Sequence, residues 1–149
     1  MRLSHYLVPT IKEIPAEAET LSHRLMLRAG LIRQLTAGVY SYLPLGWRTL
    51  RKIERIVREE MDAIGSQELY FPALQPAELW DETGRREVMD EILFQFSDHK
   101  GRNLLLAPTH EEDIAELARA YIQSYRDLPQ QWYQIQIKFR DEVRPRSGL

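Results

Sequence analysis

The sequence contains no cysteine among its 149 residues. A disulfide framework, a thiol nucleophile and a cysteine-ligated metal are therefore excluded. A strong excess of one charge is also absent, since 20 Lys and Arg residues stand against 22 Asp and Glu residues, for a net charge of −2. The chain as a whole has no general attraction to nucleic acid or to an anionic membrane. Any nucleic-acid contact must come from a local cluster of basic residues.

Long apolar runs are missing as well. No stretch approaches the roughly 20 apolar residues of a membrane-spanning helix. The first residues, MRLSHYLVPT, lack the apolar segment of a signal peptide. We therefore expect a cytoplasmic protein with no membrane partner. The four histidines lie far apart and form no helical ligand pair, so no metal site is predicted: His5, His23, His99 and His110.

What is present is the composition of an ordinary globular domain, with 44% apolar and 28% charged residues. Two segments, 47–64 and 114–125, have clear helical periodicity, because their apolar residues recur every three or four positions. Gly65 is expected to end the first helix and Pro129 the second.

Residues 17–37 are also predicted to be helical, with an interruption at Gly30. A short helix is expected at 76–85. Strands are predicted where β-branched and aromatic residues gather between turn signals, and Pro72 argues that its strand lies at a sheet edge or ends there. The expected strands are 39–46, which runs into a Pro-Gly turn, 68–74, a hairpin of 91–98 with 102–108, and 132–142. This order indicates an α+β fold, a mainly antiparallel sheet flanked by helices.

The last predicted strand has two contrasting faces. One face is apolar and is expected to pack: Tyr133, Ile135, Ile137 and Phe139. The other is mostly polar: Trp132, Gln134, Gln136, Lys138, Arg140 and Glu142. On periodicity alone a solvated outer face explains this alternation, with Arg140 and Glu142 as a weak ion pair. The mixture of glutamines, an aromatic ring and opposite charges is, however, typical of the floor of a polar pocket.

Arg140 and Glu142 stand two residues apart, just before a loop that holds Arg144 and Arg146. A guanidinium gives planar, bidentate recognition of phosphate or carboxylate. A carboxylate two residues further on can accept from an amino group such as that of adenine. This pair has the chemistry that a nucleotide-binding sheet needs. The loop arginines either contact phosphates or belong to a plain solvated turn.

The segment LLLAPTHEEDIAEL is a second candidate site at a junction of strand and helix. Thr109 and Glu112 have the spacing of a capping box, in which a hydroxyl and a glutamate satisfy the first turn of a helix. That interpretation leaves Glu111 unused. Thr109 and Glu111 together can place a hydroxyl and a carboxylate around one small cation, such as an amino-acid ammonium or the secondary amine of proline.

These segments resemble motifs of one enzyme family. KFRDE followed by RPRSGL resembles the second signature motif of class II aminoacyl-tRNA synthetases in its prolyl form, and APTHEE resembles the Thr-x-Glu loop that holds proline. MDAIGSQELYFPAL resembles the first motif. Over all 149 residues the chain is similar to the N-terminal part of the catalytic domain of a bacterial-type prolyl-tRNA synthetase. The first motif falls at about 47–74, the Thr-x-Glu loop at 107–112 and a truncated second motif at 132–149.

The resemblance implies ATP-dependent activation of L-proline and its transfer to tRNA(Pro). In this family the motif arginine, here Arg140, is the catalytic group that binds the α-phosphate and the carboxylate of proline. Glu142 would hold the adenine amino group, and Thr109 and Glu111 would bind the nitrogen of proline. ATP enters with Mg²⁺ as a substrate, and no side chain acts as a nucleophile. Catalysis would consist of alignment and charge stabilisation.

The resemblance also implies partners. The loop with Arg144 and Arg146 would approach the acceptor stem of tRNA. The helix 47–64 and the segment with Pro72 would form the interface of a homodimer. An alternative is that the helix only covers the sheet of its own subunit.

The sequence ends inside the second motif, and the third motif, the editing insertion and the anticodon-binding domain of the family are not in it. We therefore expect the full-length parent to be a ligase and the 149-residue chain alone to be inactive. A non-catalytic paralogue or a dimerisation module is the alternative, and a class II enzyme for threonine or histidine is another. Proline-dependent ATP–pyrophosphate exchange distinguishes these possibilities.

Overall fold

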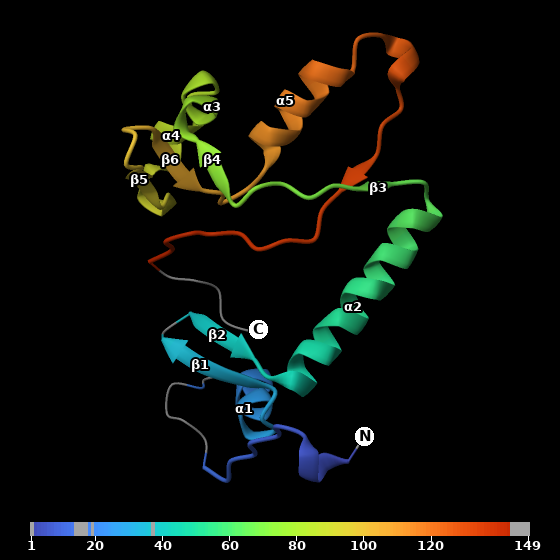
Figure 1. The fold of residues 1–149 in the computed structure, drawn as a ribbon, viewed down its shortest axis with the longest axis vertical. Helices are drawn as coiled ribbons and strands as arrows, with labels where there is room; N and C mark the ends of the chain where they lie inside the picture. The colour runs from blue at the N-terminus through green and yellow to red at the C-terminus, as the bar shows by residue number, and fades with distance from the viewer. Residues whose placement is uncertain (1, 14–17, 19, 37, 144–149) are drawn as a thin grey trace. The chain divides into compact units, whose positions relative to one another are not determined.

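The computed structural model describes residues 2–13, 18, 20–36 and 38–143 (Figure 1). It contains two compact units, Met1–Glu60 and Met61–Val143. The fold is α+β, as predicted, and its sheets are mainly antiparallel, since two of the three described sheets are antiparallel and one is parallel. None of the described helices is both long and apolar enough to cross a membrane.

The first unit is built around a β-hairpin and a short helix. Its core contains Ala18, Leu27 and Ile32, with Tyr40 packed against them. The side chain of Thr20 accepts a hydrogen bond from the backbone of the first helical turn, which fixes where that helix begins. In chain order the elements are η1 (Leu3–His5), α1 (Leu21–Arg28), β1 (Ile32–Thr36), β2 (Val39–Tyr42) and most of α2 (Pro44–Ala63).

The prediction of helix over 17–37 is wrong for its second half. α1 ends at Arg28, and Ile32–Thr36 is a strand that pairs antiparallel with Val39–Tyr42. Gly30 separates the two elements, because its φ of 65° lies in the left-handed region and a side chain there would meet the carbonyl oxygen of Pro9 at 2.9 Å. Pairing in the hairpin thus outweighs the helical propensity of the segment.

The long helix α2 is confirmed, but it begins before the predicted start, at Pro44. The expected Pro-Gly turn is wrong, because Pro44 suits the first turn of a helix, where no N–H is needed. Gly46 allows the helix to approach the residue just before β1: a Cβ on Gly46 would lie 2.1 Å from the carbonyl oxygen of Leu31. At the other end Gly65, with a φ of 80°, follows the last turn as predicted.

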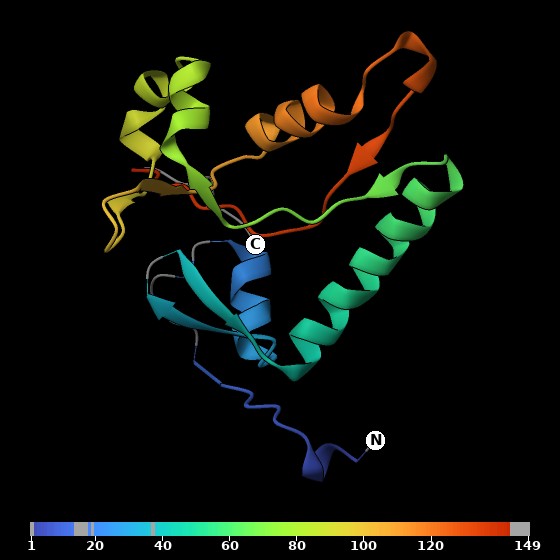
Figure 2. The same ribbon diagram turned by 45° about the horizontal axis from the view of Figure 1, so that its top comes forward.

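The second unit packs helices against a three-stranded sheet of order β4-β6-β5. Its core contains Trp80, Leu93 and Leu105. Figures 1 and 2 show α3 beside β4 and β6, where Trp80 meets Leu105. The strands are β3 (Gln67–Glu68), β4 (Leu74–Pro76), β5 (Gln95–Ser97), β6 (Asn103–Leu106) and β7 (Trp132–Tyr133); the helices are α3 (Ala77–Glu82), α4 (Arg85–Val88), η2 (Asp90–Ile92), α5 (Glu111–Tyr121) and η3 (Tyr125–Asp127).

The hairpin of β5 with β6 and the short helix α3 are confirmed, but two predicted strands are only partly formed. Residues 68–74 form no single strand, because pairing stops after Glu68 and resumes at Leu74, with Pro72 between them. Of 132–142 only Trp132–Tyr133 is a strand, and it runs parallel to β3. Beyond it the chain makes single backbone hydrogen bonds, from Phe139 to Ala107 and from Asp141 to Ile92, and no continuous ladder.

The helix predicted over 114–125 is confirmed as α5, but Pro129 does not end it. α5 stops at Tyr121, because the next turn has its own capping interactions. The carboxylate of Asp127 accepts hydrogen bonds from the backbone of Gln123 at 2.9 Å and of Ser124 at 2.8 Å. These bonds begin the 3-10 turn η3 in place of a further turn of α5.

Candidate functional site

Polar side chains of the segment after β7 reach the loop that precedes α5. Gln136 bonds both backbone groups of Phe71, accepting from its N–H at 2.9 Å and donating to its carbonyl at 2.9 Å. Arg140 Nε donates to the carbonyl oxygen of Pro108 at 3.0 Å. The predicted polar face is therefore engaged with the protein and is not a purely solvated surface. The apolar face is less buried than expected, since Ile137 is 73% exposed.

The Thr-x-Glu step forms a compact polar corner at the start of α5. Thr109 is buried, and its hydroxyl donates to the carboxylate of Glu111. The predicted capping box is wrong: no side chain caps α5, whose N-cap residue is His110, and Glu112 turns instead to Arg85 at 2.7 Å. Glu111 keeps a side chain that is 67% exposed, which leaves this carboxylate accessible to a ligand.

Buried partners hold the backbone of this loop in place. Gln75, on β4, is fully buried and donates to the carbonyl oxygen of Thr109 at 3.0 Å and to the carboxylate of Asp113. The indole N–H of Trp80 donates to the side-chain oxygen of Gln75 at 2.8 Å. The hydroxyl of Thr109 is thus fixed through its own backbone, which favours a preorganised site.

His110 is the fully buried centre of the loop. Its ring stacks on Phe71, with ring centroids 5.5 Å apart, and its Nε2 lies 3.1 Å from the carbonyl oxygen of Pro72. Lys138 contacts the other ring nitrogen, Nδ1. The side-chain amide nitrogen of Gln136 also lies 3.1 Å from Nε2. The histidine therefore joins the Lys138 segment to the Pro72 segment.

Arg85 supplies the countercharge for a buried carboxylate. Its Nη1 lies 2.7 Å from Glu112, whose side chain is 2% exposed, and 3.8 Å from Glu111. The guanidinium also lies over the ring of Trp80, 5.1 Å from its centroid. One cation thus connects the helix α4 with both glutamates at the start of α5.

Burial shifts two ionisable groups in opposite directions. It raises the pKa of the Asp113 carboxyl above its ordinary value of 3.8, although the hydrogen bond from Gln75 acts against it. It also lowers the pKa of Lys138 below 10.5, while the charges of Glu111 and Asp113 oppose that shift. Arg140 lowers the pKa of Lys138 further, so all these charges lie within electrostatic reach of one ammonium.

The raised pKa of Asp113 predicts a measurable dependence of stability on pH. A carboxyl whose pKa is higher in the folded state binds a proton more tightly there, so folding gains stability as the pH falls through the folded pKa toward 3.8. We expect urea denaturation to show the wild type gaining stability relative to Asp113→Asn over this window. The contributions of the other carboxyls to the pH dependence of stability are the same in both proteins and cancel in the difference.

Asp98 provides a control of opposite sign. Hydrogen bonds from the backbone and side chain of Arg102 lower the pKa of Asp98 below 3.8. Relative to Asp98→Asn, the wild type should therefore lose stability as the pH falls below 3.8 toward the folded pKa. A difference between wild type and Asp113→Asn that stays flat, or follows the sign of Asp98, would contradict the assignment of Asp113.

Comparison with known proteins shows which family of proteins the chain resembles. Residues 94–149 match the family model of the tRNA synthetase class II core domain (G, H, P, S and T). Over all 149 residues the chain is 59% identical to the proline–tRNA ligase of Dehalococcoides mccartyi (strain CBDB1) and 61% identical to that of Anaeromyxobacter sp. (strain Fw109-5). The chain is therefore similar along its whole length to a segment of class II aminoacyl-tRNA synthetases. The resemblance to prolyl-tRNA synthetases is confirmed, and the chain spans 26% of the length of each of these relatives.

Solved structures agree with the synthetase fold. The Giardia lamblia prolyl-tRNA synthetase in complex with prolyl-adenylate matches 79% of this chain and 25% of its own, with a TM-score of 0.72 and 25% identity. The RNA binding domain of the threonyl-tRNA synthetase from Cryptosporidium parvum Iowa II matches 76% of this chain and 29% of its own, with a TM-score of 0.70. At 23% identity the second likeness concerns the fold alone.

Of the site residues predicted from the synthetase motifs, four gather at the loop before α5. Thr109 contacts Glu111. Arg140 contacts the carbonyl oxygen of Pro108, directly before Thr109, and its Nη1 lies 3.8 Å from the carboxylate of Glu142. Pro72 lies next to this group, because its carbonyl oxygen faces His110. The two loop arginines, Arg144 and Arg146, fall outside the described residues.

Sequence reasoning missed the residues that support the site. Gln75, Arg85 and Asp113 were not singled out. Gln75 lies between the predicted strand 68–74 and the predicted helix 76–85, Arg85 ends that helix, and Asp113 lies in LLLAPTHEEDIAEL without a predicted role. His110 was considered only as a metal ligand, and Lys138 only as a member of a polar face. Among the described residues no three acidic or histidine side chains come together in a metal-binding arrangement.

Proposed function

We propose that this chain is part of the catalytic core of a proline–tRNA ligase, which activates L-proline with ATP and transfers it to tRNA(Pro). The observation that carries the proposal is the contact of Arg140 with Pro108, because it brings a phosphate-binding cation to the loop of Thr109 and Glu111. Identity of 57–61% to curated proline–tRNA ligases along the whole chain supports the same substrates.

The proline site in this proposal is formed by Thr109, Glu111 and Arg140. The secondary amine of proline is a cation with two N–H donors, which suits a hydroxyl next to an ionised carboxylate. Arg140 would bind the carboxylate of proline with a guanidinium that is 47% exposed. Glu111 and Arg140 thus offer opposite charges to the two charged ends of one amino acid.

The ATP site in this proposal adds Glu142, whose carboxylate would accept from the adenine amino group. Arg140 and Glu142 are 3.8 Å apart and partly exposed, a weak pair that a ligand replaces at little cost. Mg²⁺ enters as MgATP. A carboxylate oxygen of proline attacks the α-phosphorus and pyrophosphate leaves, so prolyl-adenylate forms. Arg140 stabilises the charge that develops on the phosphorus oxygens.

Further parts of the proposal follow from the motifs. The synthetase segments are 47–74, 107–112 and 132–149, and the loop with Arg144 and Arg146 would approach the tRNA acceptor stem in a cytoplasmic enzyme. A homodimer through α2 and Pro72 is supported by exposed apolar side chains on this helix: Ile53, Ile56 and Val57 are 54%, 55% and 41% exposed. The same exposure favours the second candidate, a dimerisation module without catalysis.

Proline-dependent ATP–pyrophosphate exchange tests the proposal in a full-length protein that carries this segment. We expect exchange with L-proline and none with threonine or histidine at the same concentration. The chain of 149 residues should show no exchange by itself. A full-length protein that forms a dimer but supports no exchange with any of the three amino acids would favour the non-catalytic module and contradict the proposed ligase.

A further inference from the structure

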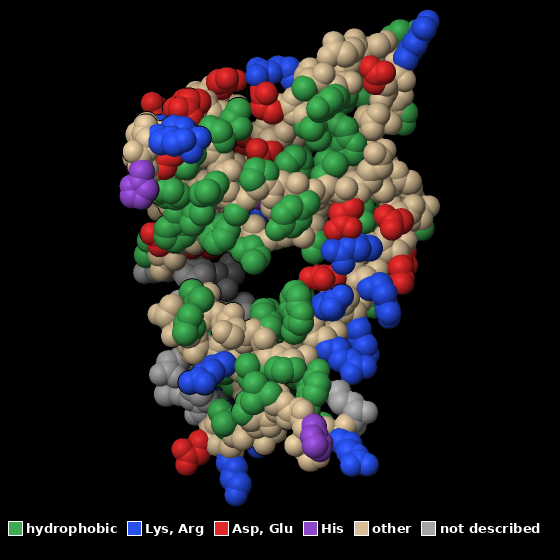
Figure 3. All heavy atoms as spheres, viewed as in Figure 1, with side chains coloured by type: hydrophobic (Ala, Val, Ile, Leu, Met, Phe, Trp, Pro, Cys, Tyr) green, Lys and Arg blue, Asp and Glu red, His purple; other side chains and the backbone are tan. Residues whose placement is uncertain are grey.

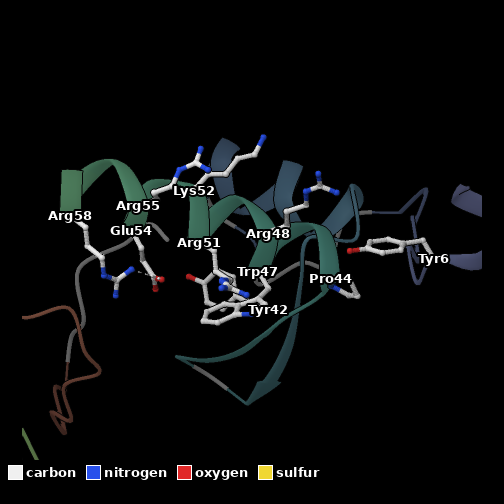
Figure 4. Close-up of a pocket in the computed structure, with 10 residues that line it drawn as sticks. All are labelled: Tyr6, Tyr42, Pro44, Trp47, Arg48, Arg51, Lys52, Glu54, Arg55 and Arg58. Carbon is white, nitrogen blue, oxygen red and sulfur yellow. Dashed lines mark ion pairs between the residues drawn. The ribbon is translucent and has the colours of Figure 1, made fainter. Parts of the chain in front are cut away.

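A groove of about 870 Å³ runs beside α2 in the first unit (Figure 4). Basic side chains of α2 line it, and blue side chains follow the same helix in Figure 3. Because α2 is proposed to lie in the homodimer interface, this groove supports no ligand site apart from that interface. The second unit instead contains a fully buried polar side chain to which the proposed function gives no role, the ring of His110.

The ring of His110 contacts two segments that are distant in the sequence. It stacks on Phe71, with ring centroids 5.5 Å apart, and its Nε2 lies 3.1 Å from the carbonyl oxygen of Pro72. The side-chain amide nitrogen of Gln136 lies 3.1 Å from the same Nε2, and Lys138 contacts Nδ1. Both ring nitrogens are thus engaged by the protein. A ring that is buried in this way positions its neighbours and does not itself touch a substrate.

The segment that reaches the ring also carries Arg140. The backbone N–H of Phe139 donates to the carbonyl oxygen of Ala107 at 3.0 Å, and Arg140 Nε donates to that of Pro108 at 3.0 Å. Lys138 contacts the buried ring. These three contacts set where Arg140 lies relative to the loop before α5. Only the contact of Lys138 uses a side chain of the loop.

His110 occupies the N-cap position of α5, but its side chain does not cap the helix. Ser, Thr, Asp and Asn are the residues that this position favours. The ring turns to the core instead, where a polar group needs partners. On either side of it in the sequence stand Thr109, whose hydroxyl donates to Glu111, and Glu111 itself, whose side chain is 67% exposed. The buried ring therefore anchors the middle of the Thr-x-Glu step.

We propose that His110 is a positioning residue that sets the distance between the amine-binding pair, Thr109 and Glu111, and the guanidinium of Arg140. This role rests on the proposed ligase, which assigns these groups to the two charged ends of proline. A small displacement of one group is costly when both ends of a small ligand must be held at once. ATP is proposed to bind outside this loop, so a displaced loop should weaken the binding of proline and not that of ATP.

Steady-state ATP–pyrophosphate exchange by the full-length protein tests this role with two isosteres of the ring. The amide of a glutamine can replace Nε2 of the histidine but not Nδ1, and the amide of an asparagine can replace Nδ1. His110→Gln should raise the KM for proline at least about tenfold and leave the KM for ATP within about twofold of wild type. His110→Asn should recover most of the affinity for proline, because it keeps a partner for Lys138.

Lys138→Met removes the other half of the contact and keeps the aliphatic part of the side chain. It should raise the KM for proline as His110→Gln does. The double variant should be no worse than either single variant, because both remove one interaction. Should His110→Gln not fold, Lys138→Met decides, since Lys138 is only partly buried. His99→Gln is the matched control, because His99 is exposed in the turn between β5 and β6 and should leave both KM values unchanged.

The KM values distinguish positioning from a merely structural role. Loss of folded enzyme lowers kcat and leaves both KM values unchanged, and that result for His110→Gln and Lys138→Met would overturn the proposal. An equal rise in the KM values of proline and ATP would overturn it as well, and so would equal losses in His110→Gln and His110→Asn. A wild type without proline-dependent exchange would overturn the ligase and this role together, whereas the other outcomes leave the ligase standing.

Discussion

Arg140→Ala in a full-length protein with this segment is expected to lower proline-dependent ATP–pyrophosphate exchange by about a hundredfold or more. A charged donor that is already oriented loses little on reorganisation when charge builds on the α-phosphate, so its removal acts on the transition state. Arg140 Nε is held by the carbonyl oxygen of Pro108 at 3.0 Å, which gives the guanidinium a defined direction. Steady-state exchange at saturating ATP and proline measures the effect.

Folding should hardly change in this variant. The Arg140 side chain is 47% exposed, and its contact with Pro108 contributes about 1 kcal/mol. Arg126→Ala is the matched control, since this arginine is exposed and lies away from the loop, over Tyr125. Near-normal exchange by Arg140→Ala, or an equal loss in Arg126→Ala, would contradict the role assigned to Arg140.

Arg85→Met is expected to lower the free energy of unfolding by about 2 to 3 kcal/mol, because it leaves the buried carboxylate of Glu112 without its countercharge. The Glu112 side chain is 2% exposed, and Arg85 is its hydrogen-bond donor at 2.7 Å. The estimate lies below the full value for a buried pair, since Arg85 is itself 37% exposed. Urea denaturation of the 149-residue chain measures the loss.

A second substitution separates the buried charge from packing. Adding Glu112→Gln to Arg85→Met should restore most of the lost stability, since a neutral amide is cheaper to bury than an unpaired carboxylate. Arg119→Met is the matched control: Arg119 pairs with Glu82 and Glu116 at side chains that are 60% and 38% exposed, so its loss should cost under about 1 kcal/mol. Equal effects of Arg85→Met and Arg119→Met would show that Glu112 needs no countercharge.

The sequence predicted those elements whose signals are local. The periodicity of 47–64 and the glycine at 65 located α2 to within a few residues, and the turn after Ser97 gave the hairpin of β5 and β6. The segment 32–36 was predicted as helix from its own residues. It is a strand because it pairs with β2, and its own pattern does not show that pairing. Residues 134–142 have an alternating pattern, but in the described chain they contribute single hydrogen bonds and form no ladder.

The site was predicted from the residues of the motifs, and not from the residues whose side chains support them. Gln75 reaches Thr109 across 34 residues and Arg85 reaches Glu112 across 27, so no local pattern connects them. Lys138 and His110 are likewise 28 residues apart. The capping-box pattern also misled, because Glu112 finds a stronger partner in Arg85 than in the backbone of its own helix.

The central claim is that Thr109 and Glu111 hold one end of a small ligand while Arg140 holds the other. A crystal structure of the full-length protein with a non-hydrolysable prolyl-adenylate analogue tests it most directly. The account predicts the pyrrolidine nitrogen within hydrogen-bonding distance of Thr109 and Glu111, and Arg140 on the phosphate-mimicking group. An analogue bound elsewhere, or bound with Arg140 turned away from it, would contradict the claim.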